Sequence, residues 1–184
     1  FVGVALSPEL AQKISNSCRS LVAIAGGKVA WQQAKNYHLT LAFAGEPARP
    51  DIPLLQRELH QSLGRISHFE CQLGLICPFP ATPAARILAV SVAVEPALES
   101  LHSRIVSVMT TLGYNVDNRS FCPHITVARL PSALPGSLQW PRITRAMRVD
   151  QVTLYDSRRD NNGAQYLPLA TISLGTTSQA AHGA

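Results

Sequence analysis

The sequence predicts an α+β protein whose strands pair mainly in antiparallel fashion. Its 184 residues are 46% hydrophobic and 15% charged, which is the composition of a folded domain rather than of a disordered chain. Thirteen prolines and eleven glycines interrupt the chain often, so we expect short elements joined by turns. Several segments with strand patterns follow one another directly, which favours antiparallel pairing over a doubly wound parallel sheet. We expect residues 1–175 to form a single domain and residues 176–184 to form a polar tail.

The chain opens with a predicted strand and a predicted helix. Residues 1–6 are apolar and indicate a buried strand. Ser7 can cap the helix that follows, and Gly26-Gly27 can end it. The apolar residues of this helix recur at helical spacing: Leu10, Ile14, Cys18, Leu21 and Val22.

Two strands are predicted next. Residues 28–33 indicate a short strand, and residues 37–45 alternate with period two. One face of the second strand carries Tyr37, Leu39, Leu41 and Phe43, and the other carries His38, Thr40, Ala42 and Ala44.

The middle of the chain predicts a helix, two strands and another helix. Residues 50–63 indicate the first helix, with Asp51 as its cap. Residues 68–80 and 86–94 have the composition of strands. Apolar residues return to helical spacing within 96–113.

The last third predicts three more strands. Residues 121–130 are strand-like, and a proline-rich connection occupies 131–146. Residues 147–157 and 164–174 indicate a final pair of strands joined by a turn-rich segment.

Charge, cysteines and hydropathy restrict the function classes. A net charge of +5 is compatible with a phosphate-bearing partner, and equally with a soluble protein that is simply basic. The four cysteines show no zinc-ligand spacing and indicate free thiols in a reducing cytosol. No apolar run approaches the roughly 18 residues of a membrane span. We therefore expect a cytoplasmic protein without a membrane partner.

The same triplet occurs twice, as His38-Leu39-Thr40 and as His124-Ile125-Thr126. On a strand, residues two apart project from one face at about 6.5–7 Å, so each triplet presents an imidazole beside a hydroxyl. A single copy is typical of an exposed strand with incidental polar residues. Two copies facing each other across a groove would form a site with two imidazoles and two hydroxyls.

Such a set of groups suits in-line displacement at phosphorus. One imidazole can act as base while the other acts as acid, because histidine titrates near neutrality. The two threonine hydroxyls can donate to non-bridging phosphoryl oxygens. An activated ester such as a 2′,3′-cyclic phosphate is favoured as substrate, since it is strained and its leaving oxygen stays tethered.

Two other interpretations stay open at this point. His38 and His124 could ligate zinc together with Cys122 or Cys77, although a third well-placed ligand is not evident. The chain could also be a non-catalytic nucleotide- or RNA-binding module that uses the same cleft.

The sequence resembles the two-histidine (2H) phosphoesterase superfamily, and within it the bacterial and archaeal RNA 2′,3′-cyclic phosphodiesterases, also described as 2′-5′ RNA ligases (ThpR/LigT type). The segments FVGVALSPEL, NYHLTLAFAGE, RILAVSVAV, NRSFCPHITVARL and LYDSRRDNNGAQYLPLATISLG carry this resemblance, which covers nearly the whole chain.

The resemblance implies a two-lobed, pseudo-symmetric LigT-like fold, with antiparallel sheets around a central cleft and helices outside. It implies hydrolysis of RNA or nucleotide 2′,3′-cyclic phosphate ends to 2′-phosphates, with no metal or other cofactor. A weak 2′-5′ RNA ligase activity belongs to the same implication. We expect a monomer whose partners are RNA ends or small cyclic nucleotides.

The resemblance also assigns site residues. His38 is expected to protonate the leaving 3′-oxygen and His124 to activate water, while Thr40 and Thr126 hold the phosphoryl oxygens. Arg129 matches an arginine that binds the phosphate. Strict alternation, however, places Arg129 on the face away from His124, so it reaches the site only if the strand ends or twists.

Further candidates come from single positions. Arg86 and Arg119 match positive positions of the family. Phe1, Tyr37 and Phe43 are candidates for stacking a base; the parity of Phe43 favours core packing instead. The remaining histidines are expected at the surface or at element boundaries: His60, His68, His102 and His182.

Overall fold

The computed structural model describes residues 1–25, 29–44, 51–82, 85–117, 119–131, 139–160 and 163–175. The elements in chain order are β1 (Val2–Ala5), α1 (Pro8–Ala25), β2 (Ala30–Trp31), the 3-10 helix η1 (Ala34–Asn36), β3 (His38–Ala42), α2 (Ile52–Leu63), β4 (Phe69–Phe79), β5 (Ile87–Val92), α3 (Pro96–Thr111), β6 (His124–Arg129), β7 (Ala146–Val149), β8 (Gln151–Asp160) and β9 (Gly163–Ser173).

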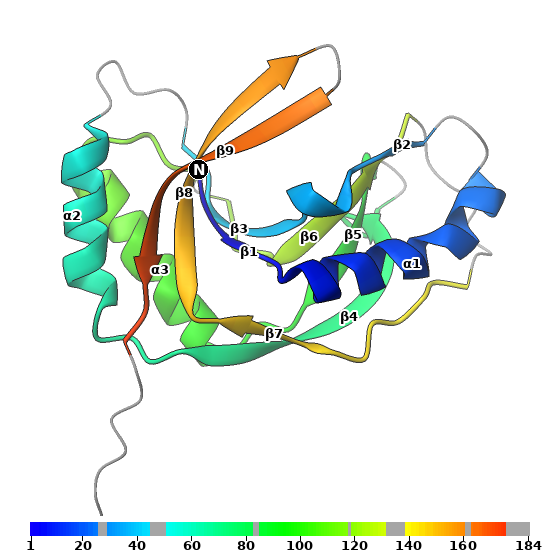
Figure 1. Ribbon diagram of the computed structural model, residues 1–184, viewed down its shortest axis with the longest axis horizontal. Coiled ribbons are helices and arrows are strands. Elements are labelled where there is room, and N and C mark those ends of the chain that lie inside the picture. The colour runs from blue at the N-terminus through cyan, green and yellow to red at the C-terminus, as the bar shows by residue number, and fades with distance from the viewer. Residues whose placement is uncertain are drawn as a thin grey trace, which may run out of the picture.

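The named strands form one sheet in the order β7-β4-β5-β6-β3-β1-β8-β9, with β2 beside β6. Every pairing between them is antiparallel, which confirms the α+β prediction. The sheet has two halves that meet where β3 pairs with β6, and each half carries one of the two His-x-Thr triplets. In the curved sheet of Figure 1, α2 and α3 lie together at one end of the molecule and α1 lies at the other.

The curl of the sheet follows from its connectivity. β7 and β8 are six positions apart in the strand order, which in a flat sheet would be about 29 Å at roughly 4.8 Å per strand. Asp150 alone joins them along the chain. The sheet must therefore bend round until its two ends approach each other, and the bend creates a concave face.

The prediction of a single strand over 147–157 was wrong, because the chain leaves one end of the curled sheet and joins the other within this segment. Residues up to Val149 pair with β4, whereas residues from Gln151 pair with β1 and β9. An exposed bend at Asp150 moves the chain from one end of the sheet to the other. The predicted end of the first helix at 26–27 and the predicted tail at 176–184 lie outside the described residues.

The predicted helix starts are confirmed. The Ser7 hydroxyl accepts from the backbone N–H of Leu10 at 3.2 Å, and the Asp51 carboxylate accepts from that of Leu54 at 2.9 Å. The predicted stripe of α1 is buried except at Val22, which is 48% exposed. Within the part of the chain that the structure describes, no helix combines the length and the apolar character needed to cross a membrane.

Candidate active site

The two His-x-Thr triplets lie side by side on neighbouring strands. Leu39 of β3 pairs with Ile125 of β6 in antiparallel register. One step to either side, this register sets His38 opposite Thr126 and Thr40 opposite His124. Directly opposed residues have Cβ atoms about 4.5–5.5 Å apart, and diagonal neighbours such as the two histidines are separated by roughly 7–8 Å.

The four polar side chains share one face of the sheet. Leu39 and Ile125 are fully buried on the core side, so their alternating neighbours point to the concave side. All four line a single cleft of about 780 Å³. The structure thus brings together His38, His124, Thr40 and Thr126, as the sequence predicts.

Each of these histidines is held by its own chain in the same way. Nδ1 of His38 lies 2.8 Å from the carbonyl oxygen of Asn36, and Nδ1 of His124 lies 2.8 Å from that of Cys122. A carbonyl oxygen can only accept, so Nδ1 donates its hydrogen in both cases. Nε2 of each ring is left to exchange a proton within the cleft.

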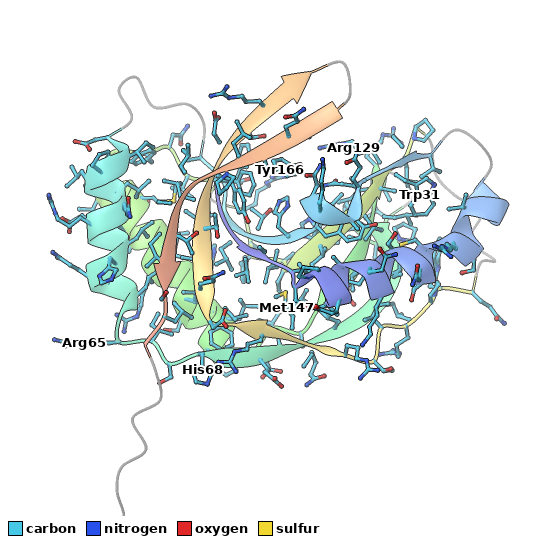
Figure 2. The ribbon with its side chains drawn as sticks, viewed as in Figure 1. Trp31, Arg65, His68, Arg129, Met147 and Tyr166 are labelled. Carbon is cyan, nitrogen blue, oxygen red and sulfur yellow. The ribbon has the colours of Figure 1, made fainter. Side chains whose placement is uncertain are left out.

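Asn36 also ties the first triplet to the β8–β9 hairpin. Its side-chain amide donates to the carbonyl oxygen of Ala164 at 3.1 Å, while its own carbonyl accepts from His38. The hairpin is thereby fixed beside the ring. Figure 2 shows Tyr166 of this hairpin and Arg129 on the same side of the sheet, where both line the cleft.

Three aromatic rings lie close to the imidazole of His38. The ring centroids of Phe1 and Tyr166 are 4.8 Å and 4.7 Å from that of His38, and Tyr155 is at 6.1 Å. Burial lowers the pKa of His38 below its ordinary value, and the charge of a protonated His124 acts in the same direction, against the hydrogen bond to Asn36. The His38 ring is thus biased toward its neutral form.

The ring of His124 is supported differently. Phe79, at the end of β4, stacks on it with a centroid distance of 4.0 Å and an interplanar angle of 25°. Nothing in the sequence indicated Phe79, Tyr155 and Tyr166 at this site, because a strand residue that packs against a ring two or three strands away leaves no local pattern.

A β-bulge decides the position of Arg129. In the pairing of β5 with β6, Ala89 faces Thr126 but Leu88 faces Ala128, so Val127 is an extra residue. The extra residue reverses the alternation beyond it. Val127 and Ala128 are both buried, and Arg129 is exposed and lines the cleft. The bulge resolves the difficulty that strict alternation raises for this arginine.

The same irregularity occurs in β3. Gly3 of β1 faces Thr40 and Val2 faces Ala42, which leaves Leu41 as the extra residue. Leu41 and Ala42 are both buried, and Phe43 is 53% exposed and lines the cleft. The sequence prediction that Phe43 packs in the core with Leu41 was therefore wrong.

Some of the other aromatic and basic candidates line the cleft, and the others lie outside it. Phe1 lines the cleft, whereas Tyr37 is only 4% exposed and packs in the core, so it cannot stack a ligand. Arg119 lines the cleft and its guanidinium binds the Asp117 carboxylate. Arg86 is exposed and is not among the described residues that line the cleft.

One histidine expected at an element boundary lies in the cleft. His102 of α3 donates through Nδ1 to the carbonyl oxygen of Leu41 at 2.7 Å, and its ring lines the cleft. His60 is exposed on α2, and Figure 2 shows His68 near the edge of the sheet that is remote from Arg129. His182 lies outside the described residues.

Metal-ligating side chains do not gather at this site. Over the described ranges, no group of three or more histidine, cysteine, aspartate or glutamate side chains is close enough to hold a metal ion. Cys122 contacts His124 through its backbone carbonyl. Cys77 lies within β4, where it pairs with Ala89.

Comparisons with known proteins agree with this geometry. Residues 28–161 match the family described as the 2′-5′ RNA ligase superfamily. A Geobacillus stearothermophilus protein named RNA 2′,3′-cyclic phosphodiesterase is 30% identical over 160 residues, which are 84% of this chain and 51% of that protein. A Bacillus subtilis protein of the same name is 26% identical over 129 residues, 70% of this chain and 69% of its own. The chain spans about half the length of the first of these relatives.

Solved structures show the same fold. The crystal structure of E. coli LigT complexed with 3′-AMP superposes with a TM-score of 0.78 at 26% identity, over 95% of this chain and 96% of that one. The crystal structure of the same protein in apo form superposes with a TM-score of 0.79 at 24% identity, over 96% of both chains.

Proposed function

The chain belongs to the 2′-5′ RNA ligase superfamily, and we propose that it hydrolyses 2′,3′-cyclic phosphate ends of RNA or of nucleotides to 2′-phosphates. The observation that carries the proposal is the register of Leu39 with Ile125, which sets two imidazoles and two hydroxyls on one face of a shared cleft. The relatives named RNA 2′,3′-cyclic phosphodiesterase support the same activity.

The hydrolysis uses the free Nε2 atoms of the two rings. Nε2 of neutral His124 takes a proton from a water molecule as the water oxygen attacks phosphorus. The bond from phosphorus to the 3′-oxygen breaks, and Nε2–H of protonated His38 donates its proton to that oxygen. The product carries a 2′-phosphate and a free 3′-hydroxyl, and one proton has passed from His38 and one to His124.

The hydroxyls and the guanidinium stabilise charge on the phosphoryl group. Thr40 and Thr126 donate to its non-bridging oxygens, where negative charge accumulates in the transition state. Arg129 binds the same group from the far end of β6 with a charge-assisted hydrogen bond. The proposal assigns no step to a metal or to another cofactor.

Joining of RNA ends uses the same roles of the two histidines with a different nucleophile. If the 5′-hydroxyl of a second RNA replaces water, His124 deprotonates that hydroxyl and the cyclic phosphate is joined through a 2′-5′ link. Such transfer is expected to be weak, because water is present at far higher concentration. We place the reaction in the cytoplasm, with a monomeric enzyme acting on RNA ends or small cyclic nucleotides.

A turnover assay with a 2′,3′-cyclic mononucleotide tests the proposal. In the presence of a chelator, we expect release of the 2′-phosphate isomer only. Loss of activity on chelation would favour a zinc centre. Tight binding of the nucleotide without any product would instead indicate a binding module.

A further inference from the structure

The two histidines of the site are held by carbonyl groups that are not equally bonded. Among the described residues, the carbonyl oxygen of Cys122 accepts from Nδ1 of His124 alone. The carbonyl oxygen of Asn36 accepts from two donors, Nδ1 of His38 at 2.8 Å and the side-chain amide of Gln32 at 3.1 Å. The two triplets are therefore alike, but the groups behind their histidines differ.

The second donor completes the bonding of the Asn36 carbonyl. A carbonyl oxygen has two lone pairs, and here both are used. The 3-10 helix η1 ends at Asn36, and the backbone N–H that closes it, from Tyr37, bonds to Ala34 instead. Two donors that approach from different residues hold the peptide group more firmly than one donor does. Gln32 thus helps to decide how this carbonyl faces the His38 ring.

The backbone of Gln32 is anchored to the other half of the site. Its N–H donates to the carbonyl oxygen of Val127 at 2.9 Å, and Val127 is the extra residue of the bulge that turns Arg129 into the cleft. Figure 2 shows Trp31, which precedes Gln32, on the same side of the sheet as Arg129. The Gln32 side chain is half-buried and lines the cleft. One residue therefore links the strand of the second triplet to the carbonyl that holds the first histidine.

The amide of Gln32 also weakens the Asn36 carbonyl as an acceptor for His38. An N–H that bonds to an oxygen draws electron density from it, so this oxygen stabilises a neighbouring imidazolium less well. Burial lowers the pKa of His38, and the hydrogen bond to Asn36 opposes that change. Gln32 reduces this opposition, and it therefore favours His38 as a proton donor.

We propose that Gln32 is a positioning residue for the reaction, which orients the His38 ring through the Asn36 carbonyl and favours His38 over His124 as the proton donor. This inference rests on the proposed function. It gives a physical reason why two equivalent triplets take different roles, since the described residues provide no second donor to the carbonyl behind His124.

Two glutamine variants test the role of Gln32. Gln32→Met keeps the length of the side chain and the backbone bond to Val127, and it removes only the amide donor. Gln33→Met is the matched control. Gln33 is the next residue, is exposed, makes no side-chain capping bond to η1 and is not among the cleft-lining residues.

Titration of the ring protons by NMR gives a readout that needs no turnover. In Gln32→Met the pKa of His38 should rise, because the Asn36 carbonyl then accepts from Nδ1 alone, and the pKa of His124 should move less. Gln33→Met should leave both titrations unchanged. The substitutions leave in place the other titratable groups around the ring, which are His124, Tyr155, Tyr166 and the amino group of Phe1.

Kinetics with a 2′,3′-cyclic mononucleotide separates positioning from binding. Gln32→Met should lower kcat and kcat/KM together, by roughly tenfold at unchanged KM, because a misdirected acid weakens the transition state and not substrate binding. Gln33→Met should match the wild type.

An unchanged His38 pKa in Gln32→Met would overturn the inference, and so would equal shifts of both histidines. A raised KM at unchanged kcat would also overturn it, because Gln32 would then bind substrate. Wild-type protein without turnover would instead refute the proposed function, while the titrations would still decide whether Gln32 controls the His38 ring.

Discussion

Leu39 and Ile125 form the residue pair through which the two His-x-Thr strands meet. Both side chains are fully buried on the core side of the sheet. Their register places each histidine opposite the threonine of the other triplet. The site is therefore a property of one strand pairing, and it depends on core residues that touch no substrate.

The first prediction concerns this buried pair. Leu39→Ala should lower the free energy of unfolding by about 2–5 kcal/mol, because it leaves a cavity at the junction of the two sheet halves. Chemical denaturation measures the loss. Val94→Ala, at an exposed site, should change stability by no more than about 0.5 kcal/mol. A Leu39 variant as stable as this control would mean that the junction is not packed as described.

The second prediction concerns the hydroxyls. Thr40→Val removes the donor but keeps the branched shape, so we expect kcat to fall by about 10²-fold or more. Thr40→Ser keeps the hydroxyl and should retain most of the rate. Steady-state kinetics on a 2′,3′-cyclic mononucleotide compares the two. If valine and serine variants behaved alike, the hydroxyl would have no role at the phosphoryl group.

The third prediction concerns the bulge at Val127. Since the bulge turns Arg129 into the cleft, Arg129→Ala should lower kcat/KM about tenfold or more through loss of a charge-assisted hydrogen bond. Arg86→Ala removes the same charge from an exposed position outside the cleft and serves as the control. Equal effects of the two substitutions would reduce the role of Arg129 to long-range attraction.

The fourth prediction concerns pH. A general acid works only in its protonated form, and burial lowers the pKa of His38. Activity that depends on protonated His38 should therefore be lost as pH rises through a value below about 6.5, the ordinary pKa of histidine.

Removing an aromatic ring that covers His38 should shift the pH at which this activity is lost. Tyr166→Ala admits water to the ring and should raise its pKa, which moves the alkaline limb of the kcat/KM profile to higher pH. Titration of the His38 ring by NMR checks the assignment. A limb that stays in place while the His38 pKa rises would assign the acid role to another group.

The sequence allowed the prediction of the triplets, of their strands and of the α+β class, because alternation and capping are local patterns. It misplaced Phe43 in the core, and alternation alone left open how Arg129 reaches the cleft, because a bulge arises between two strands and cannot be read from either strand alone. The break at Asp150 depends on how far the whole sheet curls. His102 could not be assigned to the cleft, because only the packing of α3 decides which polar side chain of that helix faces the site.

The central claim is that both imidazoles act in the same step at one phosphorus. Single-turnover rates of His38→Ala, His124→Ala and the double variant on a 2′,3′-cyclic mononucleotide test it most directly. Each single variant should be slower by on the order of 10²–10⁴-fold while remaining folded, and the double variant should be far less impaired than the product of the two losses. Wild-type turnover in either single variant would contradict the account.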